Sequence, residues 1–224
     1  MSRMIPETPE DFHGSAGEKR VFRALRALPD DIVVIHSFRW LHPGNAPALA
    51  QRLQAQGEGD FVLIDPAQGI LVVEVKGGDV WCEHGQWHQR NRKTGCVQLI
   101  NPESQASNTK FRICLDVVNR MPDAKNVLFC HAVWFPDGAV DRTNLPMNYH
   151  PDMTLDAEDV AQPATALKRV FGYWRSIQPH RGGTNKRTEA ILRVLAPSFS
   201  IVRSVRQSLD EREDVLVQLT REQT

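Results

Sequence analysis

Residues 59–78 read GDFVLIDPAQGILVVEVKGG, two apolar runs separated by the turn sequence DPAQG. The pattern predicts a β-hairpin of two buried strands. Because side chains alternate across a strand, Asp60 shares a face with positions 62 and 64, while Glu74 and Lys76 share a face with positions 70 and 72. A buried carboxylate is destabilising by several kcal/mol unless it is paired or binds a metal ion. These charges at the margin of a core therefore require a partner.

The segment before the hairpin supplies a third carboxylate. Residues 15–29 have apolar side chains at helical spacing, and Glu18 precedes Val21 and Phe22 by three and four positions, on the same helix face. Three inward carboxylates indicate a site for Mg²⁺ or Mn²⁺ with Asp60, Glu74 and Glu18 as ligands. Such an ion activates water and neutralises charge in phosphodiester hydrolysis, and Lys76 would position the nucleophile or stabilise the phosphorane.

Each of these charges also has a structural explanation. Glu74 and Lys76 would form an ion pair at a strand end, and Asp60 would be a turn residue. Glu18 would interact with the positive end of the helix dipole. These alternatives stay open at the level of the sequence.

The order of the expected elements defines the fold class. A helix over 15–29 is followed by a strand over 31–40, the hairpin, and one or two strands within 79–100. Asn101 and Pro102 begin a further helix as N-cap and first helical residue, and a strand over 126–135 and helices over 157–177 and 184–195 follow. We expect an α/β fold with a mixed central sheet flanked by helices. The predicted organisation is a flexible arm over 1–13, a main domain over 14–180 and a helical extension over 181–224.

Three segments, GEKRVFRAL, the hairpin and NPESQASNTKFRI, resemble the nuclease-related domain (NERD) family of the PD-(D/E)xK nuclease superfamily. The resemblance covers roughly residues 14–135 and implies a restriction-endonuclease-like fold and an Mg²⁺- or Mn²⁺-dependent endodeoxyribonuclease. Gly59 stands where the superfamily name has proline. The residues on which the family's active site would fall are Glu18, Asp60, Glu74, Lys76 and Gln105.

Gln105 has an independent interpretation as well. It lies in the first turn of its predicted helix, where backbone N–H groups and the helix dipole favour phosphate. The alternative is a polar first-turn residue without a binding role.

The charge distribution indicates where nucleic acid would bind. Lysine plus arginine equals aspartate plus glutamate at 27 each, but between residues 161 and 209 Glu189 is the only acid among nine basic residues. This excess is typical of a phosphate-contacting surface, with solvated helix faces as the alternative. The DNA-binding residues that we expect are Lys168, Arg169, Arg181, Lys186 and Arg187.

The last residues contain VLVQLTREQ, which resembles the glutamine motif of superfamily 1 helicases, with Gln223 as the glutamine. The sequence has no GxxxxGK[ST] motif and so no ATPase site. We expect the N-terminal piece of a longer nuclease–helicase protein. The alternative function is a non-catalytic nucleic-acid-binding or regulatory module of a helicase. RNA in place of DNA, a homodimer, and a role in DNA repair or phage defence also stay open.

The remaining features concern compartment and rival sites. The four cysteines form no CxxC pair and there is no signal peptide or apolar run of membrane length, which predicts a soluble cytoplasmic protein that contacts no membrane. Cys82, His84 and His88 lack a second cluster that would complete a zinc site. Trp81 and Trp87 are interpreted as packing residues, with base stacking as the alternative.

Overall fold

The computed structural model describes residues 1–9, 12, 15–41, 56–92 and 94–198, and its centre is a six-stranded mixed sheet. The strand order is β1-β2-β3-β4-β8-β9, with β2/β3 and β3/β4 antiparallel and the other pairs parallel. This confirms the predicted fold class. The strands are β1 (Arg3–Ile5), β2 (Val33–Leu41), β3 (Gln56–Asp65), β4 (Gly69–Val75), β8 (Phe129–Trp134) and β9 (Thr154–Leu155).

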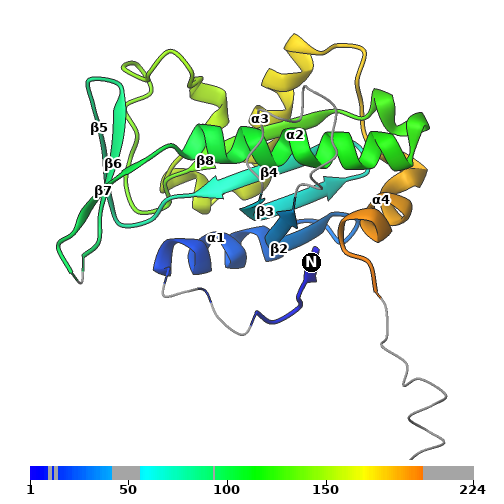
Figure 1. The fold of residues 1–224 in the computed structure, drawn as a ribbon, viewed down its shortest axis with the longest axis horizontal. Coiled ribbons are helices and arrows are strands. Elements are labelled where there is room, and N and C mark those ends of the chain that lie inside the picture. Colours follow the sequence, from blue (N-terminus) through cyan, green and yellow to red (C-terminus); the bar gives the residue numbers. More distant parts are fainter. Residues whose placement is uncertain (10–11, 13–14, 42–55, 93, 199–224) are drawn as a thin grey trace, which may run out of the picture.

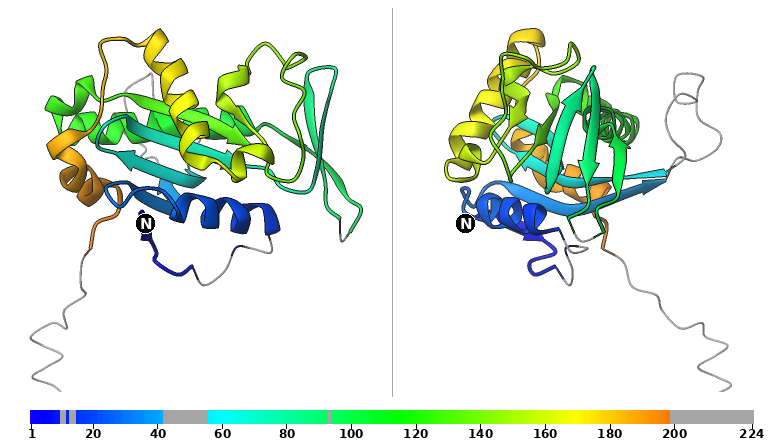
Figure 2. Two further views of the ribbon diagram at one scale, coloured as in Figure 1. Left: turned by 180° about the vertical axis from the view of Figure 1, so that it is seen from behind. Right: turned by 90° about the vertical axis from the view of Figure 1, so that its left-hand side faces the viewer.

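Helices cover both faces of this sheet (Figures 1 and 2). The apolar side chains of α1 (Ala16–Arg26) and α3 (Pro163–Ile177) form one core cluster with one face of the strands. The opposite face packs against α2 (Pro102–Arg120) and α4 (Thr188–Leu195). Four 3₁₀ helices complete the described helical segments: η2 (Pro122–Asn126), η3 (Pro151–Met153), η4 (Glu158–Val160) and η5 (Asn185–Arg187).

The predicted hairpin is confirmed as β3 and β4. Phe61 pairs with Val73 and Ile64 with Ile70. Odd positions of β3 contribute to the α1/α3 core and positions 62 and 64 to the α2/α4 core, as the alternation requires. One further step along the register places Asp60 opposite Glu74, on the side of the sheet that α2 covers.

Residues 79–100 form a separate three-stranded antiparallel sheet at one end of the molecule (Figure 1). Its strands are β5 (Asp79–Glu83), β6 (Gln86–Arg90) and β7 (Val97–Ile100), where we predicted one or two strands. His84 (φ 49°) and Gly85 (φ 77°) join β5 to β6, and two successive positive φ values are what a two-residue type I′ hairpin turn requires. Gly78 (φ 86°) turns the chain out of β4 toward this sheet.

Within residues 1–13, where we predicted a flexible arm, the structure has the short strand β1. Arg3 donates its backbone N–H to Ile32 (2.9 Å), and Met4 is buried in the α1/α3 core. Pairing with the edge of β2 and the burial of Met4 thus hold this segment in place, although its polar composition indicates a flexible arm.

At the other end of the chain, Ile191 and Leu192 of α4 pack into the core beneath α2, so the core continues past the predicted boundary at residue 180. Residues 199–224, with Gln223 and the helicase-like motif, lie outside the described residues. None of the helices in the described part of the chain is both long and apolar enough to cross a membrane.

Candidate active site

The site lies where β3 and β4 come together opposite their turn, and Glu74 is its most buried charge, with 2% of its surface exposed. Its Oε1 accepts a hydrogen bond from Lys76 Nζ at 2.7 Å. Its Oε2 is buried, and no hydrogen-bond partner for it is found among the described residues. Burial and then the charge of Asp60 raise the pKa of Glu74 to about 8, although Lys76 opposes this. Glu74 therefore offers one carboxylate oxygen to a further ligand.

Asp60 and Lys76 complete the charged group at this strand end. Asp60 Oδ2 accepts from the backbone N–H of Val75 at 2.6 Å. Burial raises the pKa of Asp60 to about 6, against the charge of Lys76 and this hydrogen bond. Burial also disfavours the charged form of Lys76, but the charges of Glu74 and Asp60 outweigh it and raise the pKa of Lys76. Lys76 is thus a stable cation between two carboxyl groups.

Glu18 approaches from the opposite face of the sheet, on the first turn of α1. Ser15 caps this helix and accepts from the backbone N–H of Glu18. Gly17 allows the close approach of α1, because a Cβ there would lie 3.0 Å from the Cα of Gly77. The Glu18 carboxylate is buried and contacts His36 Nε2 at 2.5 Å. Glu18 is therefore brought to the strand end, but it already has an imidazole partner.

Two hollows meet at Asp60 and Lys76. The first, of about 260 Å³, contains Glu74 on the α2 side, and we call it the acidic hollow. Gln105, which is exposed in the first turn of α2, lies on its wall, and Asn101 caps that turn by accepting from the backbone N–H of Ser104. The residues lining the acidic hollow are Trp40, Gly57, Glu58, Asp60, Glu74, Lys76, Gln105, Asn108 and Thr109.

The second hollow, of about 540 Å³, contains Glu18 and lies between the N-terminus of α1 and the β5–β7 sheet. We call it the arginine hollow because Arg90 and Arg92 form part of its wall. Its further lining residues are Ser15, Ala16, Gly17, Asp60, Val75, Lys76, Gly77, Gly78, Gln89, Asn91, Gln98 and Asp137. Glu18 and Glu74 thus line different hollows, and Asp60 and Lys76 line both.

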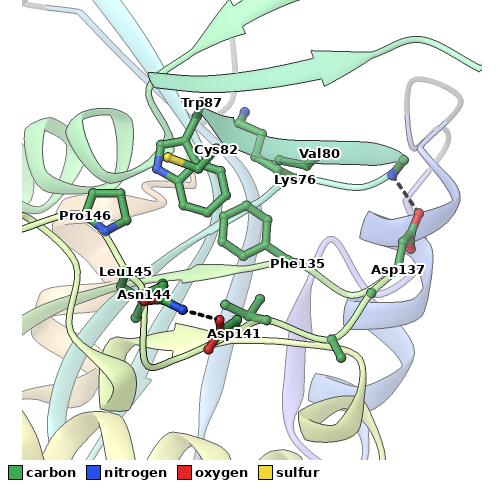
Figure 3. Close-up of a pocket in the computed structure, with 14 residues that line it drawn as sticks. Lys76, Val80, Cys82, Trp87, Phe135, Asp137, Asp141, Asn144, Leu145 and Pro146 are labelled. Atoms are coloured by element: carbon green, nitrogen blue, oxygen red, sulfur yellow. Dashed lines mark hydrogen bonds between the residues drawn. The ribbon is translucent and has the colours of Figure 1, made fainter. Parts of the chain in front are cut away.

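A third pocket, of about 310 Å³, lies behind Lys76 and is mainly apolar (Figure 3). The indole of Trp87 stacks on the ring of Phe135 at 4.8 Å between centroids. Asp137 accepts from the backbone N–H of Gly78 at 2.7 Å and so closes the loop after β8 onto the strand end. The interpretation of Trp87 as a packing residue is confirmed. Trp81 instead stacks on His88 at 5.2 Å.

The carboxylate oxygens at the acidic hollow supply some of the ligands that a hard divalent cation needs. Glu74 Oε2 is buried without a hydrogen-bond partner among the described residues, and Asp60 lies beside it on the same wall. Mg²⁺ commonly takes one or two protein carboxylates and completes its coordination with water and substrate phosphate. Within the described residues, no three His, Cys, Asp or Glu side chains form a group that could hold a metal ion. The site therefore offers a carboxylate pair.

The basic residues predicted to bind DNA lie elsewhere or are already paired. Arg169 contacts both carboxylate oxygens of Asp159 at 3.0 Å, and Arg187 pairs with Asp123 at 2.7 Å. Asn185, next to Lys186, donates its backbone N–H to Pro66 in the β3–β4 turn. The segment 181–187 is thus held at the turn end of the hairpin, roughly 20 Å from Lys76 at about 3.3 Å per strand residue. Lys168 is exposed on α3.

Two residues at the strand end were missed by sequence reasoning. Glu58 precedes Asp60 by two positions, so the same alternation that placed Asp60 also places Glu58 on the wall of the acidic hollow. His36 lies in β2 on the face that packs against α1, where it contacts Glu18. Its strand parity with the buried Val34 was a usable signal, but its partner on a separate helix was not visible in the sequence.

Comparison with known families places this site inside a matched segment. Residues 13–136, more than half of the chain, match the family model described as nuclease-related domain (NERD). The segment includes every residue that lines the acidic hollow and none of the five basic residues predicted to bind DNA. No curated protein and no solved structure matches the chain.

Proposed function

Because this chain belongs to the nuclease-related domain family, we propose that it is a metal-dependent nuclease that hydrolyses phosphodiester bonds in DNA. The observation that carries the proposal is the carboxylate pair in the acidic hollow. Glu74 is 2% exposed and its Oε2 has no hydrogen-bond partner among the described residues, while burial keeps the pKa values of Glu74 and Asp60 high. A divalent cation would satisfy that oxygen and favour the ionised carboxylates.

Asp60 and Glu74 would hold Mg²⁺ or Mn²⁺, with Glu18 completing or orienting the site. The ion would supply charge neutralisation and a water of lowered pKa. Glu18 lines the other hollow and contacts His36, so its contribution would be through position and charge at Asp60, whose pKa it helps to raise.

Lys76 would act on the attacking water or on the charge that develops at phosphorus. Its ammonium group is held 2.7 Å from Glu74 Oε1, and its raised pKa keeps it protonated near neutral pH. In this state it stabilises negative charge and donates hydrogen bonds. Gln105, exposed on the first turn of α2 at the wall of the acidic hollow, would position a phosphate oxygen there.

The test is a cleavage assay on supercoiled plasmid, linear duplex and single-stranded DNA with Mg²⁺, Mn²⁺ or EDTA, with RNA as a parallel substrate. We expect cleavage with either metal ion and none with EDTA. Absence of cleavage of every substrate, together with no calorimetric signal for either ion, would reject the enzyme.

A non-catalytic nucleic-acid-binding or helicase-regulating module is the second candidate. Two observations favour it: no three-ligand metal group is found among the described residues, and Glu18 already contacts a histidine. In that case the protein binds nucleic acid with EDTA present and cleaves none with metal. A helicase partner, a homodimer and a cytoplasmic location also stay predictions.

A further inference from the structure

The arginine hollow has a chemistry that hydrolysis at the carboxylate pair does not use. Arg90 and Arg92, both exposed, form part of its wall. Its other charged lining residues are Glu18, Asp60, Lys76 and Asp137. Arg92 pairs with Asp79 at 2.9 Å, and its side chain is 61% exposed. Exposed ion pairs are weak, so a phosphate can replace Asp79 as its partner. Arg90 forms no ion pair with a carboxylate among the described residues.

The N-terminus of α1 points into the same hollow. Ser15, Ala16 and Gly17 are part of its lining. Ser15 accepts from the backbone N–H of Glu18. The other N–H groups in the first turn have no acceptor within the helix, and together with the helix dipole they favour a phosphate. Helix and arginines thus present donors from opposite sides.

A side-chain amide pair fixes the arginines relative to the candidate active site. Gln98 Nε2 donates to Gln89 Oε1 at 3.1 Å, and Gln89 Nε2 donates to the backbone carbonyl of Gly77 at 2.8 Å. Gly77 directly follows Lys76. These hydrogen bonds connect β7 through β6 to Gly77. They therefore hold Arg90 and Arg92 at a fixed position relative to Lys76 before any ligand binds.

Arg90 also links the hollow to an aromatic stack on the β5–β7 sheet. Its guanidinium lies over the indole of Trp81 at 5.3 Å, and Trp81 stacks on His88 at an interplanar angle of 11°. Nucleobases stack on guanidinium and imidazole planes that lie at the ends of such a stack. Base faces are covered by neighbouring bases in a duplex and are free in a single strand, which favours an unpaired strand as the ligand.

We propose that the β5–β7 sheet is a binding surface for an unpaired nucleic-acid strand, whose phosphates contact Arg90, Arg92 and the N-terminus of α1 in the arginine hollow. The inference rests on the proposed function, since it places the strand next to the carboxylate pair. It places the principal phosphate contact at this sheet and not at the segment 181–187, because that segment lies at the opposite end of β3 and β4.

The experiment compares two double variants of the full chain with the same change in charge: Arg90→Ala/Arg92→Ala, and the matched control Lys186→Ala/Arg187→Ala. Binding of a fluorescein-labelled single-stranded oligonucleotide and of its duplex is followed by anisotropy in EDTA between 50 and 200 mM salt. We expect the sheet variant to lose about tenfold or more in affinity for the single strand. Its salt slope should fall by about 1.4, at roughly 0.7 per phosphate contact. The control should keep both values.

Circular dichroism and thermal melting establish that both variants are folded. His88→Ala is a second probe, because it removes the ring that stacks on Trp81 and, when the imidazole is neutral, changes no charge. We expect His88→Ala to weaken single-strand binding without changing the salt slope. Equal binding by wild type and the sheet variant would overturn the inference, as would loss confined to the control or a wild type that binds only duplex. Because binding is measured in EDTA, a wild type that binds the strand but never cleaves rejects the proposed catalysis and leaves this surface supported.

Discussion

Each end of the β3–β4 hairpin carries a carboxylate, but the two carboxylates differ in the hydrogen-bond donors that they contact. At the turn end, Asp65 Oδ1 accepts from the backbone N–H groups of Ala67 and Gln68 at 2.8 and 3.0 Å. At the open end, Glu74 accepts from Lys76 alone and its Oε2 is buried without a hydrogen-bond partner among the described residues. Both carboxyl groups are desolvated and both have raised pKa values, yet only Asp65 is compensated by backbone donors.

This difference separates a structural carboxylate from one available for binding. Asp65 closes an Asx-type turn, which is the ordinary use of aspartate in that position. Glu74 lacks equivalent donors and lies beside a second carboxylate and a hollow, an arrangement that is unfavourable in the fold itself and is expected where a cation or substrate completes the site. The candidate active site is therefore distinguished by a buried carboxylate oxygen with no hydrogen-bond partner among the described residues, more than by the presence of charge at a strand end.

The largest expected effect is that of Glu74→Gln. The substitution keeps the shape and the Lys76 contact but removes a negative metal ligand. We expect metal-dependent cleavage to fall by about three orders of magnitude or more, since metal-ion charge stabilisation is worth several kcal/mol and each tenfold in rate is about 1.4 kcal/mol. Cleavage rates measured at saturating Mg²⁺ test this.

Asp65→Asn is the matched control at the turn end. An asparagine oxygen also accepts from Ala67 and Gln68, so cleavage should be unchanged and stability only slightly lowered. If Asp65→Asn abolished cleavage, or Glu74→Gln left it intact, the distinction between the two ends would be wrong.

Lys76→Ala should have the next largest effect, a loss of about a hundredfold or more in rate, as for a positioned group that transfers a proton or stabilises charge. Calorimetry should still detect Mg²⁺ or Mn²⁺, because both carboxylates remain. Loss of metal binding together with activity would instead make Lys76 a structural partner of Glu74.

The sequence determined most of the open end in advance because strand alternation is a local property. Asp60, Glu74 and Lys76 were placed on their face by parity, and Gln105 on its helix turn by the Asn101–Pro102 start. What could not be read locally was the pairing between distant elements. The contact of His36 with Glu18 joins β2 to α1, and the packing of Arg3–Ile5 beside β2 depends on an edge that only the assembled sheet presents.

The DNA-binding residues expected from charge composition stay a prediction. The basic excess after residue 161 is real, but Arg169 and Arg187 are paired with Asp159 and Asp123, and both of those acids precede the residues over which the excess was counted. A one-dimensional count cannot show which charges are compensated in space. Arg90 and Arg92 belong to residues 79–100, where three basic residues nearly balance two acids, and they line a hollow that Asp60 also lines.

Gly69→Ala probes the turn end and should act on stability without acting on the site chemistry. Gly69 has φ 133°, and a Cβ there would lie 2.4 Å from the carbonyl oxygen of Leu128. We expect a loss of about 2 kcal/mol in the free energy of unfolding, from backbone strain and the displaced β8 start. Denaturant unfolding measures it.

Gly172→Ala, in the middle of α3 with open space around the new Cβ, is the control for Gly69→Ala and should stabilise by about 0.5–1 kcal/mol. Residual folded Gly69→Ala protein should cleave at the wild-type rate per folded molecule. A selective loss of catalysis would show that the two hairpin ends are coupled.

A further expected effect is a pH dependence of stability that belongs to the open end. Folding raises the pKa values of Asp60 to about 6 and of Glu74 to about 8, in both cases chiefly by burial. The folded state then binds more protons than the unfolded state between about pH 4 and 8. The stabilisation is complete below the unfolded pKa values and is lost as the pH rises through the folded ones. Without metal ion, the free energy of unfolding should therefore decline from pH 5 to pH 8.

Glu74→Gln sharpens this measurement, because glutamine does not titrate. The variant should lose the part of the decline nearest pH 8 and become more stable than wild type there in EDTA, whereas Asp65→Asn should keep that part of the decline. Mg²⁺ should stabilise wild type more at pH 8 than at pH 6, since protons and cation compete for the same oxygens. Chemical denaturation at each pH, with EDTA or Mg²⁺, measures all three. A wild-type stability that rises from pH 6 to pH 8 in EDTA would mean that the open-end carboxylates are compensated as fully as Asp65, and the contrast between the two ends would disappear.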